Sequence, residues 1–378
     1  MAVTLGVVRE TAGSERRVAL APEVVKKLGG LGVDVAMEKG AGDGAFLPDE
    51  KFANDNLELA DSAGEVLGKA DLIFKVQAPT ADEIAQMREG SMLVAAMNPT
   101  RNLQSIKLMA ERKITCWATE FIPRISRAQA MDTLSSQAAV AGYLGVLKAA
   151  TLSVKFFPML TTAAGTIRPS KVLVLGAGVA GLQAIATARR LGAMVEAYDI
   201  RPETKEQCES LGAKFVDTGI DASGEGGYAR ELTGEEQAKQ KEIVDAHIAK
   251  ADCIVTTAAI PGRPSPKLID QAAVEAMQPG SVIVDLASEG GGNCALTQPG
   301  EIINHNGVTI AGPLNVPSEL ALHASEMFAK NLFNFTMLLI KDEKLEIDWE
   351  DEVIAKACLT HNGEIKNDMI RKLVEESQ

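Results

Sequence analysis

Short apolar runs alternate with segments of helical spacing along the first third of the chain. The apolar runs predict strands at Val3–Val8, Val33–Glu38, Asp71–Val76, Met92–Met97 and Lys113–Thr119. The segments between them predict helices at Pro22–Leu31, Asp82–Glu89 and Leu103–Arg112. Strands that alternate with helices indicate a parallel sheet covered on both faces, so this region is expected to form an α/β domain.

A long helical stretch, Gln129–Phe157, precedes a second region with the same alternation and predicts a helix that links two domains. Further strands are expected at Lys171–Leu175, Met194–Tyr198, Lys214–Val216, Cys253–Thr257, Ser281–Ala287 and Val308–Gly312. Further helices are expected at Leu182–Leu191, Lys205–Leu211 and Glu231–Lys250. Asn315–Ile340 again has the pattern of a long helix, which would return the chain to the first domain for Trp349–Gln378 to complete.

The stretch Lys171–Arg201 predicts a ligand-binding site. Its first strand runs into Gly176-Ala-Gly178-Val-Ala-Gly181 and then into a helix. Gly176 allows the tight turn, Gly178 lets a pyrophosphate approach the backbone, and Gly181 lets the helix pack close to the strand. The helix N-terminus offers N–H groups to the phosphates. A second strand ends in Asp199, which can accept hydrogen bonds from an adenosine ribose and would repel a 2′-phosphate. The unit predicts an NAD(H) site, with a purely structural glycine turn as the alternative.

These patterns together predict an α/β protein of two Rossmann-like domains with parallel sheets, joined by long helices and separated by a cleft. The N-terminal domain is expected to comprise residues 1–137 and 326–378, and the NAD(H)-binding domain residues 138–325. A second glycine-rich stretch, Gly40–Gly44, follows a strand but no helix follows it at once, so it predicts a turn.

Two further segments carry candidate chemistry. Pro123–Gln137 (PRISRAQAMDTLSSQ) concentrates polar side chains near the proposed domain boundary, and Gln129 and Asp132 would share one face of a helical turn. A solvated helix start, capped by Ser126 or Asp132, is the alternative. Asp285–Asn293 and Thr256–Thr257 follow strands, where ligands of parallel sheets bind, although a glycine-rich strand exit would have the same pattern.

Charge and cysteine content argue against several kinds of binding partner and site. The net charge is −13 and the Lys and Arg residues are scattered, which argues against nucleic acid or an anionic membrane face as a direct partner. The five cysteines form no C-x-x-C pair and lie next to no histidine, so we expect reduced thiols and neither disulfides nor a metal site. No N-terminal signal peptide and no uncharged run of the roughly 20 residues that span a membrane is visible, so a cytoplasmic protein is expected.

No histidine lies beside the candidate segments. The four are His247, His305, His323 and His361. Oxidation of an alcohol or amine needs a general base, commonly His or Lys, whereas hydride transfer between two nicotinamide rings needs only alignment and exclusion of water. The sequence therefore favours the second reaction.

Over essentially its whole length the chain resembles the NAD(H)-binding domain I, the alpha subunit, of proton-translocating NAD(P) transhydrogenase in its split-chain bacterial form. Its segment RISRAQAMDTLSSQ is much more specific than the glycine pattern. Other matching segments are Glu15–Leu28, Thr162–Ala193, Gly226–Glu231, Pro261–Ile269, Gly291–Cys294 and Asn315–Ala321.

The resemblance implies roles for individual residues. Gln129 would hold the carboxamide and ring of the nicotinamide, in a pocket shaped by Arg124, Asp132 and Ser135. The pyrophosphate would lie against Gly176, Gly178, Val179, Ala180 and Gly181, and the adenosine ribose against Asp199, Ile200 and Arg201. Gly227 and Tyr228 match a mobile loop that closes over the nucleotide, and other contacts are expected from Gln240, Thr257 and Ala259.

In that family, hydride passes from NADH to NADP⁺ on a separate domain III, coupled to proton movement through membrane domain II. The resemblance therefore implies a homodimer that needs both partner domains and is held on the cytoplasmic side of the inner membrane through them.

Two alternatives remain. The first is an NAD-dependent amino-acid dehydrogenase of the alanine dehydrogenase type. Arg17 and Lys75 resemble the residues that bind the substrate carboxylate in that family. Against it, Leu93–Thr100 has no histidine where those enzymes carry their catalytic one, and Glu289 stands where they have an aspartate. The second is a regulatory module that binds NADH without transferring hydride.

Overall fold

The computed structural model describes residues 2–220, 233–259 and 264–376 of the chain. The chain divides into two compact units, Met1–Gln137 with Pro317–Gln378, and Ala138–Val316. The first boundary falls inside helix α5 (Thr133–Leu152). The second precedes helix α11 (Ala321–Thr336), inside which the boundary at residue 326 suggested by the sequence would fall.

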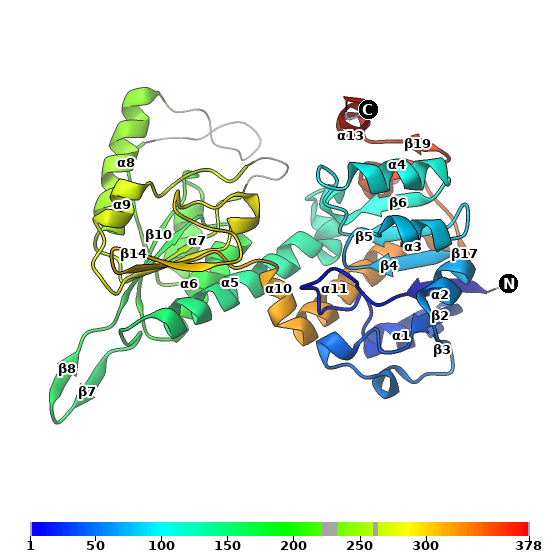
Figure 1. Ribbon diagram of the computed structural model, residues 1–378, viewed down its shortest axis with the longest axis horizontal. Helices are drawn as coiled ribbons and strands as arrows, with labels where there is room; N and C mark the ends of the chain where they lie inside the picture. The colour runs from blue at the N-terminus through cyan, green and yellow to red at the C-terminus, as the bar shows by residue number, and fades with distance from the viewer. Residues whose placement is uncertain (1, 221–232, 260–263, 377–378) are drawn as a thin grey trace. The chain divides into compact units, whose positions relative to one another are not determined.

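An eight-stranded sheet forms the centre of the first unit, in the order β19-β18-β6-β5-β4-β1-β2-β3 (Figure 1). Its parallel strands are β1 (Val3–Val7), β2 (Val33–Glu38), β3 (Leu57–Ala60), β4 (Leu72–Lys75), β5 (Met92–Ala95) and β6 (Thr115–Ala118). The C-terminal segment adds two antiparallel strands at one edge, β18 (Cys358–His361) and β19 (Glu364–Ile365).

Neighbouring residues of these strands enter different apolar cores because a strand alternates its side chains between the two faces. Phe74, Val94 and Trp117 belong to one core, and Ile73 and Leu93 belong to the other. Both faces are therefore buried, which explains why the strands have continuous apolar runs. The first unit includes the helices α1 (Pro22–Gly29), α2 (Ala63–Lys69), α3 (Ala81–Gln86), α4 (Leu103–Glu111), α11, α12 (Glu352–Ala357) and α13 (Asp368–Glu376).

The second unit is built on a seven-stranded sheet in the order β11-β10-β9-β12-β13-β15-β14. Its strands are β9 (Lys171–Leu175), β10 (Met194–Tyr198), β11 (Lys214–Phe215), β12 (Cys253–Thr256), β13 (Val282–Asp285), β14 (Ile302–His305) and β15 (Val308–Ala311). Within it, only β14 is antiparallel to its neighbour. The strand order reverses between β9 and β12, and ligands of such sheets bind beyond the carboxyl ends of the strands at that point.

Helices α6 (Val179–Arg190), α7 (Thr204–Ser210), α8 (Gly234–Ile248) and α9 (Gln271–Glu275) belong to this unit, as does most of α5 (Figure 1). A hairpin of β7 (Leu160–Thr162) and β8 (Gly165–Ile167) extends from it, and a second short hairpin, β16 (Ile340–Lys341) and β17 (Lys344–Leu345), belongs to the first unit. Among the described residues, no helix is both long enough and apolar enough to span a bilayer.

The predicted α/β class with two Rossmann-like parallel sheets is confirmed. The predicted extents of the two long helices, Gln129–Phe157 and Asn315–Ile340, were wrong. Gln129–Phe157 is split into a 3₁₀ turn, η4 (Ser126–Met131), and helix α5, because the Asp132 side chain accepts a hydrogen bond from Ser135 N and starts a new helix. Asn315–Ile340 is split at Leu320, whose φ of −108° and ψ of 46° are not helical.

Candidate functional site

The glycine turn after β9 divides into two glycines that the fold requires and one that it does not. Gly176 has φ of +97°, and a Cβ there would lie 2.8 Å from Thr257 Oγ1. A Cβ on Gly181 would lie 1.8 Å from the Gly176 carbonyl oxygen. By contrast, apart from the adjoining residues of the turn, no described atom lies within 4 Å of the position that a Cβ on Gly178 would take. Within the described part of the chain, the side of the turn at Gly178 is therefore left open.

The N-terminus of α6 faces the same opening. Gly178 is its N-cap, and within the described part of the chain no side chain caps the helix. The first N–H groups of a helix have no partner within it and carry a partial positive charge, so they attract an anion. Val179 is 43% exposed at this end. Thr257 Oγ1 donates to the Gly176 carbonyl at 2.9 Å and fixes the turn from the neighbouring strand. These residues fit a pyrophosphate.

Asp199 follows β10, and both oxygens of its carboxylate accept hydrogen bonds from residues of the same chain. Its Oδ2 accepts from Ala177 N at 2.7 Å, and its Oδ1 accepts from Arg201 N at 2.9 Å. The Arg201 guanidinium donates to both oxygens, from Nε to Oδ1 and from Nη2 to Oδ2, each at 3.0 Å. The hydrogen bond and charge of Asp199 raise the pKa of Arg201. The carboxylate thus connects the glycine turn to the guanidinium of Arg201.

Other sequence-based candidates surround this edge of the sheet. Gln240, on α8, donates to the hydroxyl of Tyr198, whose pKa burial raises to about 12. Ile200 and Ala259 are exposed. Gly227 and Tyr228 lie outside the described residues.

Asp285 and Asn293 have structural partners that account for them. Asp285, fully buried, accepts from Thr256 Oγ1, Thr297 Oγ1 and the N–H groups of Ala287 and Cys294 at 2.6–3.1 Å. Asn293 bonds both backbone groups of Ala258 at 2.7–3.0 Å. The strand-exit alternative explains this segment, which holds the loop beside Thr257 in place.

In the first unit, the segment Pro123–Gln137 is anchored at several points. Arg127 forms a bidentate ion pair with Asp351 at 2.6 and 2.9 Å. The Ala130 carbonyl accepts from Asn331 and Asn334 of α11 at 2.8 and 2.9 Å. Gln129 and Arg124 are exposed. Gln129 lies in the 3₁₀ turn, so it is presented on a turn fixed on both sides rather than on the continuous helix that its spacing suggested.

Asp132 and Ser135 bond to each other at the start of α5. Asp132 accepts from Ser135 N at 2.8 Å and from Ser135 Oγ at 2.6 Å. This is helix capping, the structural alternative for Asp132.

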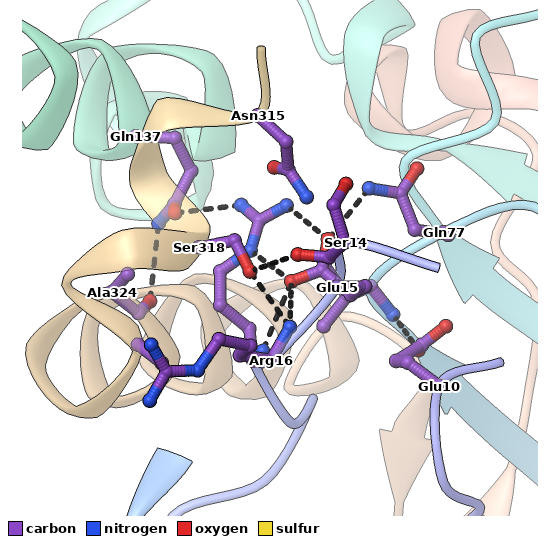
Figure 2. Close-up of polar contacts among 12 residues, drawn as sticks. Glu10, Ser14, Glu15, Arg16, Gln77, Gln137, Asn315, Ser318 and Ala324 are labelled. Atoms are coloured by element: carbon purple, nitrogen blue, oxygen red, sulfur yellow. Dashed lines mark hydrogen bonds and ion pairs between the residues drawn. The ribbon is translucent and has the colours of Figure 1, made fainter. Parts of the chain in front are cut away.

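A polar network ties Gln137, the last residue of that segment, to the loop after β1 (Figure 2). Arg17 donates to Gln137 Oε1 at 2.9 Å, and Gln137 donates to the Ala324 carbonyl at 3.1 Å. Arg17 also pairs with both oxygens of Glu15 at 2.7 Å, and Gln77 donates to Glu15 at 2.7 Å. Burial alone would raise the pKa of Glu15, but hydrogen bonds and the charge of Arg17 lower it to about 2. Glu15 therefore stays ionised and balances the charge of Arg17.

Lys75 is satisfied in the same way. Its ammonium group, 1% exposed, lies 2.8 Å from Glu83 and 3.1 Å from Glu10. Burial raises the pKa of Glu10 although Lys75 opposes the shift. Two cations that could receive a substrate carboxylate are each paired with carboxylates of their own chain.

The remaining titratable candidates have ordinary structural partners. His247 contacts Glu196 at 2.6 Å, His305 contacts Glu275, and His361 contacts Thr115 and packs on Trp349. All five cysteines are free and buried. Across the described ranges, no group of three potential metal ligands occurs.

Sequence reasoning missed one residue that shapes the site, Gly142 of α5. A Cβ there would lie 2.1 Å from the carbonyl oxygen of Ala180, so α5 packs directly on the first turn of α6. Gly145, one turn further, would meet Leu286 in the same way at 2.8 Å. The signal was a glycine pair at helical spacing inside an otherwise apolar helix.

Comparisons with known proteins agree with this arrangement. The models for the alanine dehydrogenase/PNT N-terminal and C-terminal domains match residues 6–141 and 145–368. The chain is 48% identical over 372 residues to an NAD(P) transhydrogenase alpha subunit of Rhodospirillum rubrum, covering 96% of this chain and 97% of that protein.

Solved structures give the same result. The crystal structure of transhydrogenase from Sinorhizobium meliloti matches with a TM-score of 0.88 and 45% identity, over 96% of this chain and 99% of that one. An L-alanine dehydrogenase shares the fold with a TM-score of 0.84 at 23% identity over the full length of both chains. The glycine turn, the two Rossmann-like sheets and these matches establish that the chain belongs to the NAD-binding alpha-subunit family of the NAD(P) transhydrogenases.

Proposed function

We propose that this chain binds NADH and passes its hydride to NADP⁺ held on a separate domain III of a proton-translocating transhydrogenase. Proton movement would take place in a membrane domain II carried by other chains, and this chain would act as a homodimer attached to the cytoplasmic side of the inner membrane through them. The Rhodospirillum rubrum relative is named as a subunit, which supports a dependence on further chains.

The open side of Gly178 is the observation that carries the proposal. It leaves room for a pyrophosphate against the N-terminus of α6, where backbone N–H groups stabilise negative charge. Val179, Ala180 and Gly181 would donate there, and Gly176 and Thr257 would hold the turn. Asp199, Ile200 and Arg201 would receive the adenosine ribose, with Gln240, Ala259, Gly227 and Tyr228 as further contacts.

Hydride transfer between two nicotinamide rings requires the protein to orient the rings and does not require it to transfer a proton. NADH, when bound, supplies the hydride. Gln129 would orient the nicotinamide through its carboxamide, next to Arg124, Asp132 and Ser135. The anchoring of the 3₁₀ turn by Asn331 and Asn334 supports this role, because a fixed backbone holds a side chain in one orientation before the ligand arrives.

The test is to mix the purified chain with a transhydrogenase domain III, NADH and an oxidised NADP analogue, and to follow reduction of the analogue. Reduction that requires both proteins is the expected result. Binding of NADH without any transfer would point instead to a regulatory module, and absence of NADH binding would remove the proposal.

Amino-acid oxidation of the alanine dehydrogenase type is the second candidate, because the family models cover both activities. The pairing of Arg17 with Glu15 and of Lys75 with Glu10 and Glu83 counts against it. Alanine-dependent reduction of NAD by the chain alone would reverse this preference.

A further inference from the structure

The glycine-rich stretch Gly40–Gly44 leads into a residue with an unusual backbone conformation. Phe46 closes the 3₁₀ turn η1 (Asp43–Ala45) with φ of 58° and ψ of 33°, in the left-handed region. Glycine and asparagine adopt this conformation readily, whereas a bulky residue adopts it at a cost in energy. Ala45 and Leu47 are buried on either side, but Phe46 is 68% exposed. The chain thus bears backbone strain at a position where the ring gains little burial.

The loop after β1 lies against this turn. A Cβ on Gly44 would lie 2.8 Å from the carbonyl oxygen of Arg16, so the two backbones are in direct contact. The Arg16 guanidinium lies over the Phe46 ring, 5.3 Å from its centroid, which is within the range of a cation–π contact. Arg16 is exposed, and no carboxylate in the described part of the chain forms an ion pair with its guanidinium. The surface therefore presents a cation and an aromatic ring side by side.

The turn that carries Phe46 has a defined conformation of its own. Phe46 N donates to the Asp43 carbonyl and Leu47 N donates to the Gly42 carbonyl, both at 3.0 Å. Gly42 lies so close to Leu47 that a Cβ on it would meet the Leu47 carbonyl oxygen at 2.2 Å. A ring held in this way loses little freedom when a partner covers it, and contacts that are preorganised gain affinity for that reason.

The Arg16–Phe46 pair and the proposed nicotinamide contacts lie at the same edge of the first unit. Arg16 follows β1, Phe46 follows β2, and turn η4 with Gln129 follows β6, and the carboxyl ends of these parallel strands meet at one edge. Helix α11 packs against both η1 and η4. Its Ser325 also accepts from Val18 N at 3.0 Å, in the chain just after Arg16. One helix therefore holds the pair and the turn of Gln129 in a common frame.

We propose that Arg16 and Phe46 form a docking contact for the protein that carries NADP(H), which presents a carboxylate to the guanidinium and an apolar side chain to the ring. This rests on the proposed function, because transfer between two nicotinamide rings requires the partner to approach the edge at which Gln129 lies. Arginine and aromatic side chains are among those that contribute most to binding at protein interfaces. A carboxylate on the partner follows from the positive charge of Arg16, which the described carboxylates leave unengaged.

The test measures how the rate of hydride transfer depends on the concentration of a transhydrogenase domain III. Phe46→Asn removes the ring and relieves the backbone, because asparagine tolerates the left-handed region. Half-maximal transfer should require at least ~10-fold more domain III than with wild type, the scale of an interface hot spot. The rate at saturating domain III and the affinity for NADH should change by less than about 2-fold, since only docking is affected. The urea midpoint should be no lower than that of wild type.

Substitutions of Arg16 test the charge of the partner. Arg16→Gln should also raise the required concentration of domain III, and Arg16→Glu should raise it further because one carboxylate would then face another. Added salt should reduce the difference between wild type and Arg16→Gln. Because the cation and the ring contact each other, the variant with both Arg16→Gln and Phe46→Asn should lose less than the product of the two single effects.

Met369→Asn is the matched control, since it replaces another exposed apolar side chain of the first unit, on α13. It should require no more domain III than wild type does. Phe46→Gly gives the same measurement as Phe46→Asn if the latter does not fold.

Three results would overturn the proposal. They are transfer by Phe46→Asn and Arg16→Gln at the domain III concentrations that suffice for wild type, an equal effect of Met369→Asn, and a matching loss of NADH affinity, which would assign the pair to the nucleotide instead. Failure of the proposed function has a different signature, because wild type would then transfer no hydride at any concentration of domain III.

Discussion

The substitution Gly178→Ala separates ligand binding from folding. Gly178 has φ of −75° and ψ of −168°, an extended conformation that any residue adopts, and apart from the adjoining residues no described atom lies within 4 Å of the added methyl group. A residue other than glycine also restricts the unfolded chain, which favours folding by about 0.4–1 kcal/mol. The weaker preference of Ala for the N-cap position opposes this by a similar amount. The free energy of unfolding should stay within about 1 kcal/mol of wild type.

NADH binding should respond quite differently. The methyl group occupies the space through which a pyrophosphate would reach the N-terminus of α6, so phosphate contacts with the backbone must lengthen or the nucleotide must shift. We expect at least ~10-fold weaker NADH binding, which corresponds to about 1.4 kcal/mol.

Gly181→Ala is the matched control, because this substitution should lower the stability of the fold. Its Cβ would lie 1.8 Å from the Gly176 carbonyl oxygen, so the backbone must move and the fold should lose about 1–3 kcal/mol or more. Urea titrations give the stability of both variants and calorimetry gives their NADH affinity. Wild-type affinity in Gly178→Ala, or a loss of stability in it equal to that of Gly181→Ala, would refute the assignment of the open side to the pyrophosphate.

Three further predictions follow from contacts in the two units. Gln129→Asn should slow hydride transfer to a domain III far more than it weakens NADH binding, and equal losses in stopped-flow and calorimetric measurements would remove its orienting role. The pKa of Glu15 is about 2, below its ordinary 4.5, so its ion pair stabilises the fold above about pH 4.5 and this contribution is lost as the pH falls toward 2. Glu15→Gln should therefore be less stable than wild type at pH 7, with a difference that shrinks between pH 4.5 and 3 in denaturant titrations; a constant difference would contradict the ion-pair explanation. Asp285→Asn should cost about 2–3 kcal/mol of unfolding free energy in urea because its amide places N–H groups against four donors, whereas Asp217→Asn should leave stability nearly unchanged.

The sequence predicted the central strands well because most of their residues are buried and apolar. The ranges of β2, β9 and β10 coincide with the predicted ones. Most strands it missed lie at sheet edges or outside the main sheets, although β18 is buried between β19 and β6. β3 and β14 each form an edge and contain exposed polar residues, and every residue of the β7–β8 hairpin is exposed. A half-exposed strand of four residues gives too weak a pattern to recognise.

The candidate site was predictable where its chemistry is local in sequence. The glycine turn and Asp199 fall within one strand–helix–strand unit, so their spacing alone identifies them. The packing of Gly142 on Ala180 and the hydrogen bond from Thr256 to Asp285 depend on contacts between segments far apart in the chain. Such contacts leave no periodic signal. The engagement of Asp199 by Arg201 is local, but it depends on a side-chain conformation that composition and spacing do not specify.

Within this family the fold does not select the reaction, because an L-alanine dehydrogenase shares it with a TM-score of 0.84. Selection must come from local charge. An enzyme that binds a small carboxylate needs a cation whose bonding capacity the protein has left for the substrate, since a carboxylate already paired there would have to be displaced at the cost of a buried charge. Here Glu15 pairs with Arg17 through both oxygens, and Glu10 and Glu83 flank Lys75, which is 1% exposed. One of these cations, Arg17, instead fastens the loop after β1 to Gln137, at the end of the segment that carries Gln129. This hydrogen bond of Arg17 helps to fix the segment for which we propose contacts with the nicotinamide, and transfer of a hydride between two bound rings would require such fixed positions.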